Sequence, residues 1–265
     1  MRKFIISVLV MAVLMSGLLV GCKSPKGTLQ FKANGEDFVR QGFVSKDGWA
    51  ISFDHIYVNL ASVTSYQCDP PYDPHQGGQI EAETEVALEG PHTVDLAKGD
   101  ENASRILVGE VTDAAVGHYN AISWKMTPAS SGPAEGYSLI IDGTAKKDGE
   151  IVQFVIKDGS EYLYVCGEYV GDERKGFVEK DGAGEVEMTF HFDHIFGDAE
   201  TPMDDDLNVG APGFAPFAQA TEGGTLEASL SELKSMLSAE GYQLLLDMLP
   251  TLGHVGEGHC HCEVQ

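Results

Sequence analysis

The sequence predicts a mainly β protein, an antiparallel β-sandwich followed by a short helical segment near the C-terminus. Glycine and proline, 31 and 11 of the 265 residues, interrupt short runs of β-branched and aromatic residues over roughly the first 200 positions. Several of these runs alternate apolar and polar residues, as a strand with one buried face does. Regularly spaced strands without intervening helices are typical of a sandwich or a barrel, and we predict the sandwich.

Ten segments are predicted as strands, and one pair shows the pattern clearly. Val152, Phe154 and Ile156 alternate with polar neighbours, and the dipeptides Asp148-Gly149 and Asp158-Gly159 are typical turn sequences. In chain order the predicted strands are residues 28–33, 49–63, 83–88, 92–96, 106–110, 117–126, 137–147, 151–157, 162–169 and 184–196.

The periodicity of the sequence changes at about Thr225. Four leucines then recur at helical spacing, and residues 242–249 predict a second short helix that ends before Pro250. We therefore divide the chain into a leader at 1–21, a β-sandwich domain at 22–224, and C-terminal helices with a tail at 225–265. The four leucines are Leu226, Leu230, Leu233 and Leu237.

The N-terminus has the features of an export signal. Arg2 and Lys3 precede an apolar run at residues 4–20, which is too short for a stable membrane span. The run closes with Leu-Leu-Val-Gly-Cys at residues 18–22 and resembles the lipobox of bacterial lipoproteins. That resemblance implies that Cys22 becomes the lipidated first residue of the mature chain. It also implies a location in the bacterial cell envelope, periplasmic or at the cell surface, with the membrane as a partner through the lipid anchor.

A Cys22→Ser substitution tests the predicted anchor. Without the thiol no acyl chains can be attached, so we expect the variant to leave the membrane fraction. Fractionation of cells that express each form measures this. Unchanged membrane retention of the variant would contradict lipidation at Cys22.

The chain is strongly acidic. It has 17 Lys and Arg against 41 Asp and Glu, and the formal net charge is −24. Removal of residues 1–21 takes away Arg2 and Lys3 and no acidic residue, which leaves 15 − 41 = −26. Such a chain is not expected to bind nucleic acid, whereas its field raises the local concentration of cations.

Cysteine usage is consistent with export. Apart from Cys22, the chain has Cys68 and Cys166 in its body and Cys260 and Cys262 in its tail. An even number in an oxidising compartment favours disulfide formation. We predict a Cys68–Cys166 disulfide, which leaves the two tail cysteines for a metal ion.

The C-terminal tail is rich in potential metal ligands. Imidazole nitrogen and thiolate sulfur bind zinc and copper, and the surrounding glycines allow a short backbone to fold around one centre. The spacing matches no standard zinc motif, so a disordered tail with incidental histidines is the alternative. The five ligand residues are His254, His259, Cys260, His261 and Cys262.

Two segments share the sequence Phe-Asp-His-Ile, at residues 53–56 and 192–195, and each is followed by an aromatic residue. Each repeat contributes one histidine, His55 or His194. His191 precedes His194 by three positions, so in an extended chain the two side chains lie on opposite faces. They meet at one ion only if the strand bends or ends there. Taken alone, each repeat histidine is better interpreted as a core side chain bonded to a backbone carbonyl.

Together with the tail, the repeats predict a roughly tetrahedral site for one transition-metal ion, zinc or copper. Its four histidines come from the two repeats and the tail: His55, His194, His254 and His259. The other nearby ligands are predicted as substitutes or as a second site: His191, His261, Cys260 and Cys262. The remaining histidines lack such neighbours and are predicted to be structural: His75, His92 and His118.

Residues 92–96, 106–111 and 116–124 contain a Val-Asp-Leu sequence and, further on, a Gly-x-Tyr sequence at residues 117–119. They resemble the core of bacterial β-sandwich lipoproteins, including the MbnP-like proteins associated with copper handling. The resemblance spans about 40 residues of strand and turn, so it implies the fold and carries over no ligands.

The sequence favours an exported lipoprotein that binds zinc or copper for uptake, delivery or sensing, with a membrane transporter or receptor as a partner. Common nucleophile-elbow, phosphate-loop and zinc-protease motifs are absent from the sequence. A cell-surface interaction module with structural histidines is the alternative. A metal-dependent hydrolase is a further alternative, with Asp54, Asp193 or Glu257 as its base. The acidic segment 197–208 lacks EF-hand spacing and is predicted to be a solvated loop.

Overall fold

The computed structural model describes residues 24–265. Cys22 and the predicted leader lie outside this range. This part of the chain is mainly β, with 45% of its residues in strands and 17% in helices. Within residues 24–265, no helix has both the length and the apolar character that a membrane span requires.

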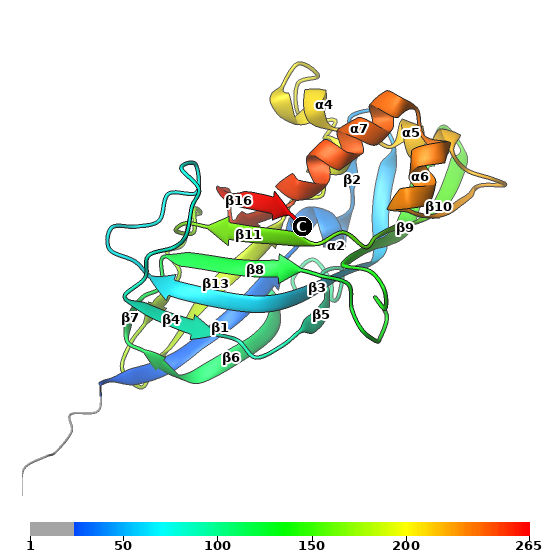
Figure 1. Ribbon diagram of the computed structural model, residues 1–265. Coiled ribbons are helices and arrows are strands. Elements are labelled where there is room, and N and C mark those ends of the chain that lie inside the picture. The colour runs from blue at the N-terminus through cyan, green and yellow to red at the C-terminus, as the bar shows by residue number, and fades with distance from the viewer. Residues whose placement is uncertain (1–23) are drawn as a thin grey trace, which may run out of the picture.

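The strands follow one another along most of the chain (Figure 1). They are β1 (Lys26–Asn34), β2 (Phe43–Val44), β3 (Ala50–Gln67), β4 (Thr84–Ala87), β5 (His92–Asp95), β6 (Ile106–Ala115), β7 (Gly117–His118), β8 (Ala121–Met126), β9 (Leu139–Lys147), β10 (Glu150–Asp158), β11 (Tyr162–Cys166), β12 (Phe177–Val178), β13 (Ala183–Phe190), β14 (Thr225–Ser229), β15 (Gly253–Val255) and β16 (Gly258–Val264).

The helices are short and lie mostly in the C-terminal third. They are α2 (Glu36–Gln41), α3 (Asp193–Phe196), α4 (Asp206–Gly210), α5 (Ala215–Gln219), α6 (Leu230–Met236), α7 (Ala239–Met248) and the 3₁₀ turn η1 (Leu249–Thr251).

Fourteen strands form one curled, mixed sheet. Its order is β14-β10-β9-β3-β8-β11-β16-β15-β13-β1-β6, and β2, β4 and β5 also pair with β3. The pairs β1·β13 and β10·β14 are parallel. The predicted β-rich fold is therefore confirmed, but the sheet is not a purely antiparallel sandwich.

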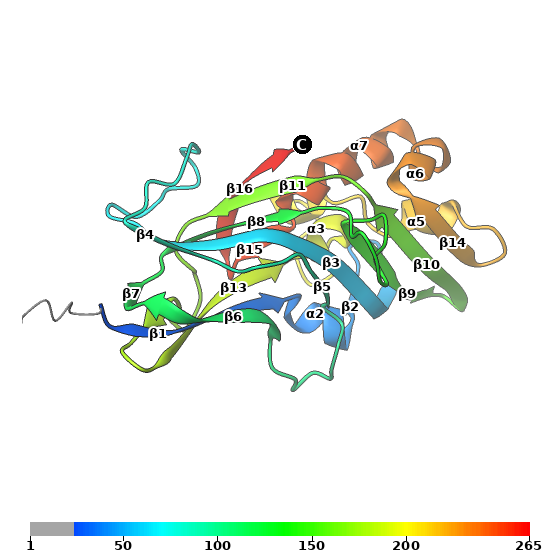
Figure 2. The ribbon, with the colours of Figure 1, turned by 60° about the horizontal axis from the view of Figure 1, so that its bottom comes forward.

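The β15–β16 hairpin joins the two halves of this sheet, which curl around a common core (Figure 2). Trp124 of β8 and Phe190 of β13 belong to different halves, and their ring centroids lie 6.1 Å apart in an edge-on arrangement. Both side chains are fully buried. The last residues of the chain thus belong to the sheet and are not a loose tail.

Local sequence accounts well for the β9–β10 hairpin. Asp148 and Gly149 both have positive φ, 51° and 87°, as a tight hairpin turn requires. Of the predicted alternating residues, Val152 and Phe154 are buried. Ile151, on the opposite face, is 56% exposed.

The strand predicted over residues 184–196 ends earlier than expected. Extended structure stops at Phe190, and residues 193–196 form the single-turn helix α3. Phe192 and Phe196 are four positions apart. Their ring centroids lie 6.3 and 6.2 Å, respectively, from the ring centroid of Phe53. One helical turn places both rings on the same side, where the core covers them.

Helical structure in the C-terminal region also begins later than the leucine pattern suggested. Residues 225–229 extend the sheet as β14 beside β10. Ser229 then caps α6 together with Glu232, in a reciprocal capping box.

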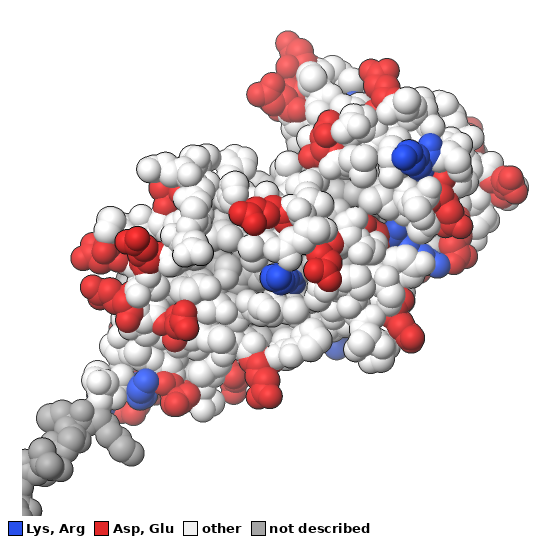
Figure 3. All heavy atoms as spheres, viewed as in Figure 1, with Lys and Arg blue, Asp and Glu red and all other residues white. Residues whose placement is uncertain are grey.

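The surface is acidic on the face shown in Figure 3. Asp and Glu side chains are spread over much of this face, and Lys and Arg occur as a few separate spots. This distribution agrees with the net charge of −24.

Candidate metal centre

Four histidine rings lie side by side where β13, α3, β15 and β16 meet. We call them the imidazole cluster: His191, His194, His254 and His259. The ring centroid of His191 lies 5.6 Å from that of His194 and 4.3 Å from that of His254. His254 is 5.1 Å from both His194 and His259.

The backbone explains how residues about 60 positions apart come together. His254 of β15 stands opposite Thr189 of β13 and opposite His259 of β16. The backbone N–H of His191 donates to the carbonyl of Leu252 at 3.0 Å. Because β13 ends at Phe190, the α3 turn brings His194 back beside His191, which an extended strand would prevent.

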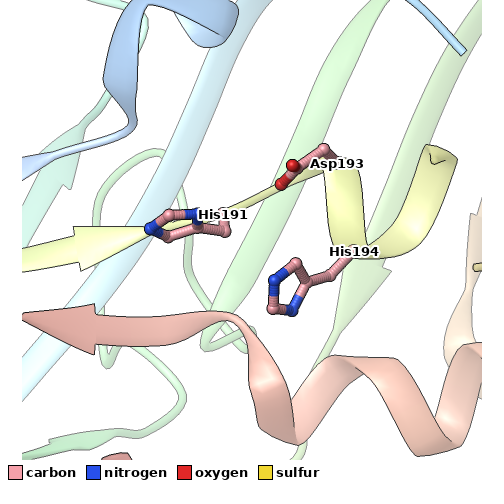
Figure 4. Close-up of side chains that lie close together, drawn as sticks. All are labelled: His191, Asp193 and His194. Atoms are coloured by element: carbon pink, nitrogen blue, oxygen red, sulfur yellow. The ribbon is translucent and has the colours of Figure 1, made fainter. Parts of the chain in front are cut away.

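Asp193 adds a carboxylate to the cluster (Figure 4). One ligand atom each from His191, Asp193 and His194 lie within 4.8 Å of one another, as a shared ion requires. Figure 4 shows the Asp193 carboxylate directed toward His191. Its Oδ1 is buried and has no hydrogen-bond partner in the described part of the chain.

Hydrogen bonds hold one nitrogen of each of three rings. His191 Nε2 donates to the Gly256 carbonyl at 3.2 Å, and His254 Nε2 donates to the Thr251 carbonyl at 3.0 Å. The Thr251 hydroxyl donates to Met248, so it accepts from His194 Nδ1 at 2.7 Å.

Each bond places a proton on the bonded nitrogen and leaves the other ring nitrogen without a hydrogen bond. The nitrogens without a hydrogen bond are Nδ1 of His191, which lies 3.6 Å from the Glu36 carboxylate, Nε2 of His194 and Nδ1 of His254. Within residues 24–265, His254 Nδ1 is buried and has no partner. Histidine ligands of metal ions commonly have this arrangement, in which the second ring nitrogen is held by a backbone carbonyl or another acceptor.

The protonation states of His194 and His254 suit ligation. Burial lowers the pKa of His194 to about 4 and that of His254 to about 3. These values include a smaller lowering by the neighbouring imidazoles, because two positive charges side by side are unfavourable. Both rings are therefore neutral at pH 7, the form that binds a metal ion.

The spacing of the rings is compatible with one ion. With a metal–nitrogen distance of about 2.1 Å, two imidazole centroids lie roughly 5 Å apart at a tetrahedral angle and at most about 6 Å apart. The four separations given above, 4.3 to 5.6 Å, fall in or near this range, and the ligand atoms that converge within 4.8 Å are those of His191, Asp193 and His194.

His55 does not join the cluster, so that part of the predicted set is wrong. It lies on β3, and β8, β11 and β16 separate this strand from β15. Its Nδ1 is 2.8 Å from the Asp95 carboxylate, and its ring stacks on Tyr57. The hydrogen bond to Asp95 raises the pKa of His55. His191 occupies the place in the cluster that was predicted for His55.

The predicted Cys68–Cys166 disulfide is also wrong. Cys166 is bonded to Cys260, and their Cα atoms are 4.3 Å apart because the two residues face each other in the β11·β16 pair. Cys68 is a free, buried thiol at the end of β3, and its backbone N–H donates to Asn120. Cys260 is therefore not available as a metal ligand.

The other predicted tail ligands lie outside the cluster's hydrogen-bond network. Cys262 is a free thiol, and burial raises its pKa to about 12, so a thiolate ligand is unfavourable at neutral pH. His261 Nε2 lies 3.8 Å from the Glu263 carboxylate on the same strand.

Sequence reasoning missed Glu36 as a neighbour of the cluster. Its carboxylate lies 3.6 Å from His191 Nδ1, and it lines a surface cavity of about 390 Å³ together with Glu257. Burial raises the pKa of Glu36, and His191 opposes the rise. Glu36 has φ of 59°, an uncommon conformation for a residue other than glycine. No motif marks this position in the sequence.

Comparison with known proteins gave no match to a family model, to a curated protein or to a solved structure. The geometry of the site therefore carries the functional argument.

Proposed function

We propose that this chain binds a transition-metal ion, zinc or copper, at the imidazole cluster. His191, Asp193 and His194, whose ligand atoms lie within 4.8 Å of one another, are the ligands in this proposal, and His254 or His259 completes the coordination. One observation carries it: ligand atoms of His191, Asp193 and His194 converge within 4.8 Å, beside imidazoles whose other nitrogen is held by an acceptor.

A purely structural role explains the cluster less well. Buried polar atoms in cores normally have partners, and a buried atom without one costs about 1 to 3 kcal/mol. His254 Nδ1 and Asp193 Oδ1 both lack partners among residues 24–265. A bound ion would satisfy both atoms. Imidazole nitrogen with an added carboxylate oxygen suits zinc, and imidazole also suits copper.

We place this activity in the bacterial cell envelope, with the chain anchored through Cys22. The Cys166–Cys260 disulfide is compatible with an oxidising, extracytoplasmic compartment. The acidic surface raises the concentration of cations near the protein. The proposed role is uptake, delivery or sensing of the ion, and the proposed partner is a membrane transporter or receptor.

Calorimetric titration of the metal-free protein with zinc, and separately with copper, tests the proposal. We expect one tightly bound ion per chain, unchanged in His55→Ala and lost in the His191→Ala, His254→Ala double variant. The stoichiometry should persist at pH 6, because the pKa values of His194 and His254 are about 4 and about 3. Failure of the wild type to bind either metal would contradict the proposed function.

A further inference from the structure

The loop between β3 and β4 brings a fifth histidine to the cluster. The ring centroid of His75, which is exposed, lies 6.2 Å from that of His259. Figure 1 shows this loop beside the β11 and β16 strands. Gly77 of the same loop lies against His261, since a β carbon at Gly77 would be 3.6 Å from the imidazole ring.

Specific contacts hold the loop in this position. At its start, the Asn120 side chain accepts from the Cys68 N–H at 2.8 Å and donates to the Cys68 carbonyl at 3.0 Å. The Asp73 carboxylate accepts from the backbone N–H of His75 at 3.0 Å. The loop also packs on Gly167, where a β carbon would lie 2.8 Å from the Tyr72 carbonyl oxygen.

His259 connects this loop to the buried part of the site. It is exposed, whereas its partner across the β15–β16 hairpin, His254, is only 4% exposed. The centroid distances from His75 through His259 and His254 to His191 are 6.2, 5.1 and 4.3 Å. The two inner steps lie within the separation of about 6 Å at which two imidazoles can share one ion, and the step from His75 to His259 is only slightly longer.

We propose that His75 and His259 form the entry site for the metal ion, which captures the hydrated cation at the surface and passes it to the buried site. This inference rests on the proposed function. Capture replaces water ligands of the ion by imidazole nitrogens. Transfer then forms a bond to His254 as the bond to His75 breaks, so no redox step and no further reactant is needed. The ion is never without nitrogen ligands along this path.

His259 belongs to both the entry site and the cluster, whereas His75 lies outside the final coordination and acts on rates and not on final affinity. It lowers the barrier between the solvated and the buried ion, so its removal slows binding and release by the same factor. A ligand of the buried site acts differently, because its removal weakens equilibrium binding.

Stopped-flow zinc binding to metal-free full-length protein tests this, with release measured by transfer to a chelator. In His75→Ala we expect both rates to fall about tenfold or more, a typical size for the loss of local cation capture, with Kd unchanged within about twofold. Gln79→Ala is the matched control, since it changes an exposed side chain of the same loop and should leave both rates unaltered.

Three results would overturn the entry site. Wild-type rates in His75→Ala would show that the ion enters elsewhere, and the proposed metal binding would still stand. A loss of affinity without slower binding would make His75 a ligand of the final site. Absence of zinc and copper binding in the wild type would overturn both the entry site and the proposed function.

Discussion

Replacement of His254 by Ala is expected to weaken zinc binding by more than about 100-fold. Loss of an acceptor that merely orients a ligand typically costs 10- to 100-fold, and loss of the ligand itself should cost more. His254 lies closest to the other rings of the cluster and is 4% exposed. Its burial keeps water from replacing the lost nitrogen efficiently.

Thr251→Val gives a more specific test of the same site. The hydroxyl of Thr251 holds His194 Nδ1 at 2.7 Å, and the backbone carbonyl of the same residue holds His254 Nε2. Valine keeps the shape and the carbonyl but removes the hydroxyl. We therefore expect zinc affinity to fall by about 10- to 100-fold through His194 alone.

Competition with a chelator of known affinity measures both effects. His55→Ala is the control, because it removes an exposed histidine that is paired with Asp95, away from the cluster. Urea unfolding of each metal-free variant shows whether it is folded. Wild-type affinity in a folded His254→Ala protein would remove this residue from the ligand set.

The strand content could be predicted because it depends on local patterns. Alternation in β10 and the Asp148-Gly149 turn act over a few residues, and the structure follows both. The pairing of strands depends on contacts between distant residues. Nothing in the sequence of β1 indicates that it pairs in parallel with β13, about 150 positions later.

The tail shows where composition misleads. Residues 253–264 looked like a glycine-rich metal-binding tail, yet they form the β15–β16 hairpin that joins the two halves of the sheet. Histidine and cysteine at alternate positions of β16 also fit a strand, with the two residue types on opposite faces. The metal-binding residue types of the tail therefore outweighed the alternation that also predicts a strand.

The site was predictable in part. His194, His254 and His259 were predicted from the sequence to share one site, and the structure places these three in one cluster. The repeated Phe-Asp-His-Ile segment suggested equal roles for His55 and His194, but one copy lies in a strand and the other in the α3 turn. Identical short sequences adopt different structures when different core contacts surround them.

Removal of the Cys166–Cys260 disulfide is expected to destabilise the fold by about 4 to 5 kcal/mol. The bond closes a segment with a sequence separation of 94, and a cross-link of this size restricts the unfolded chain strongly. The double variant Cys166→Ala, Cys260→Ala avoids a new unpaired thiol beside Cys262. Urea unfolding of the metal-free protein measures the loss.

Cys68→Ala is the control for this experiment, because it removes a buried cysteine and keeps the disulfide. It should cost far less than the double variant. Peptide mapping of the wild type under non-reducing conditions should recover the Cys166–Cys260 pair. Recovery of Cys68 joined to Cys166 would contradict the connectivity.

The disulfide variant also separates stability from ligation. The bond holds β16 against β11, so its loss should loosen His259 on β16. The other three histidines lie outside β16: His191 just before α3, His194 in α3, and His254 on β15. We therefore expect the folded double variant to lose about tenfold in zinc affinity, near the lower end of what loss of ligand orientation costs and well below the loss in His254→Ala. Equal losses in the two variants would mean that β16 contributes as much to the metal centre as the buried histidines do.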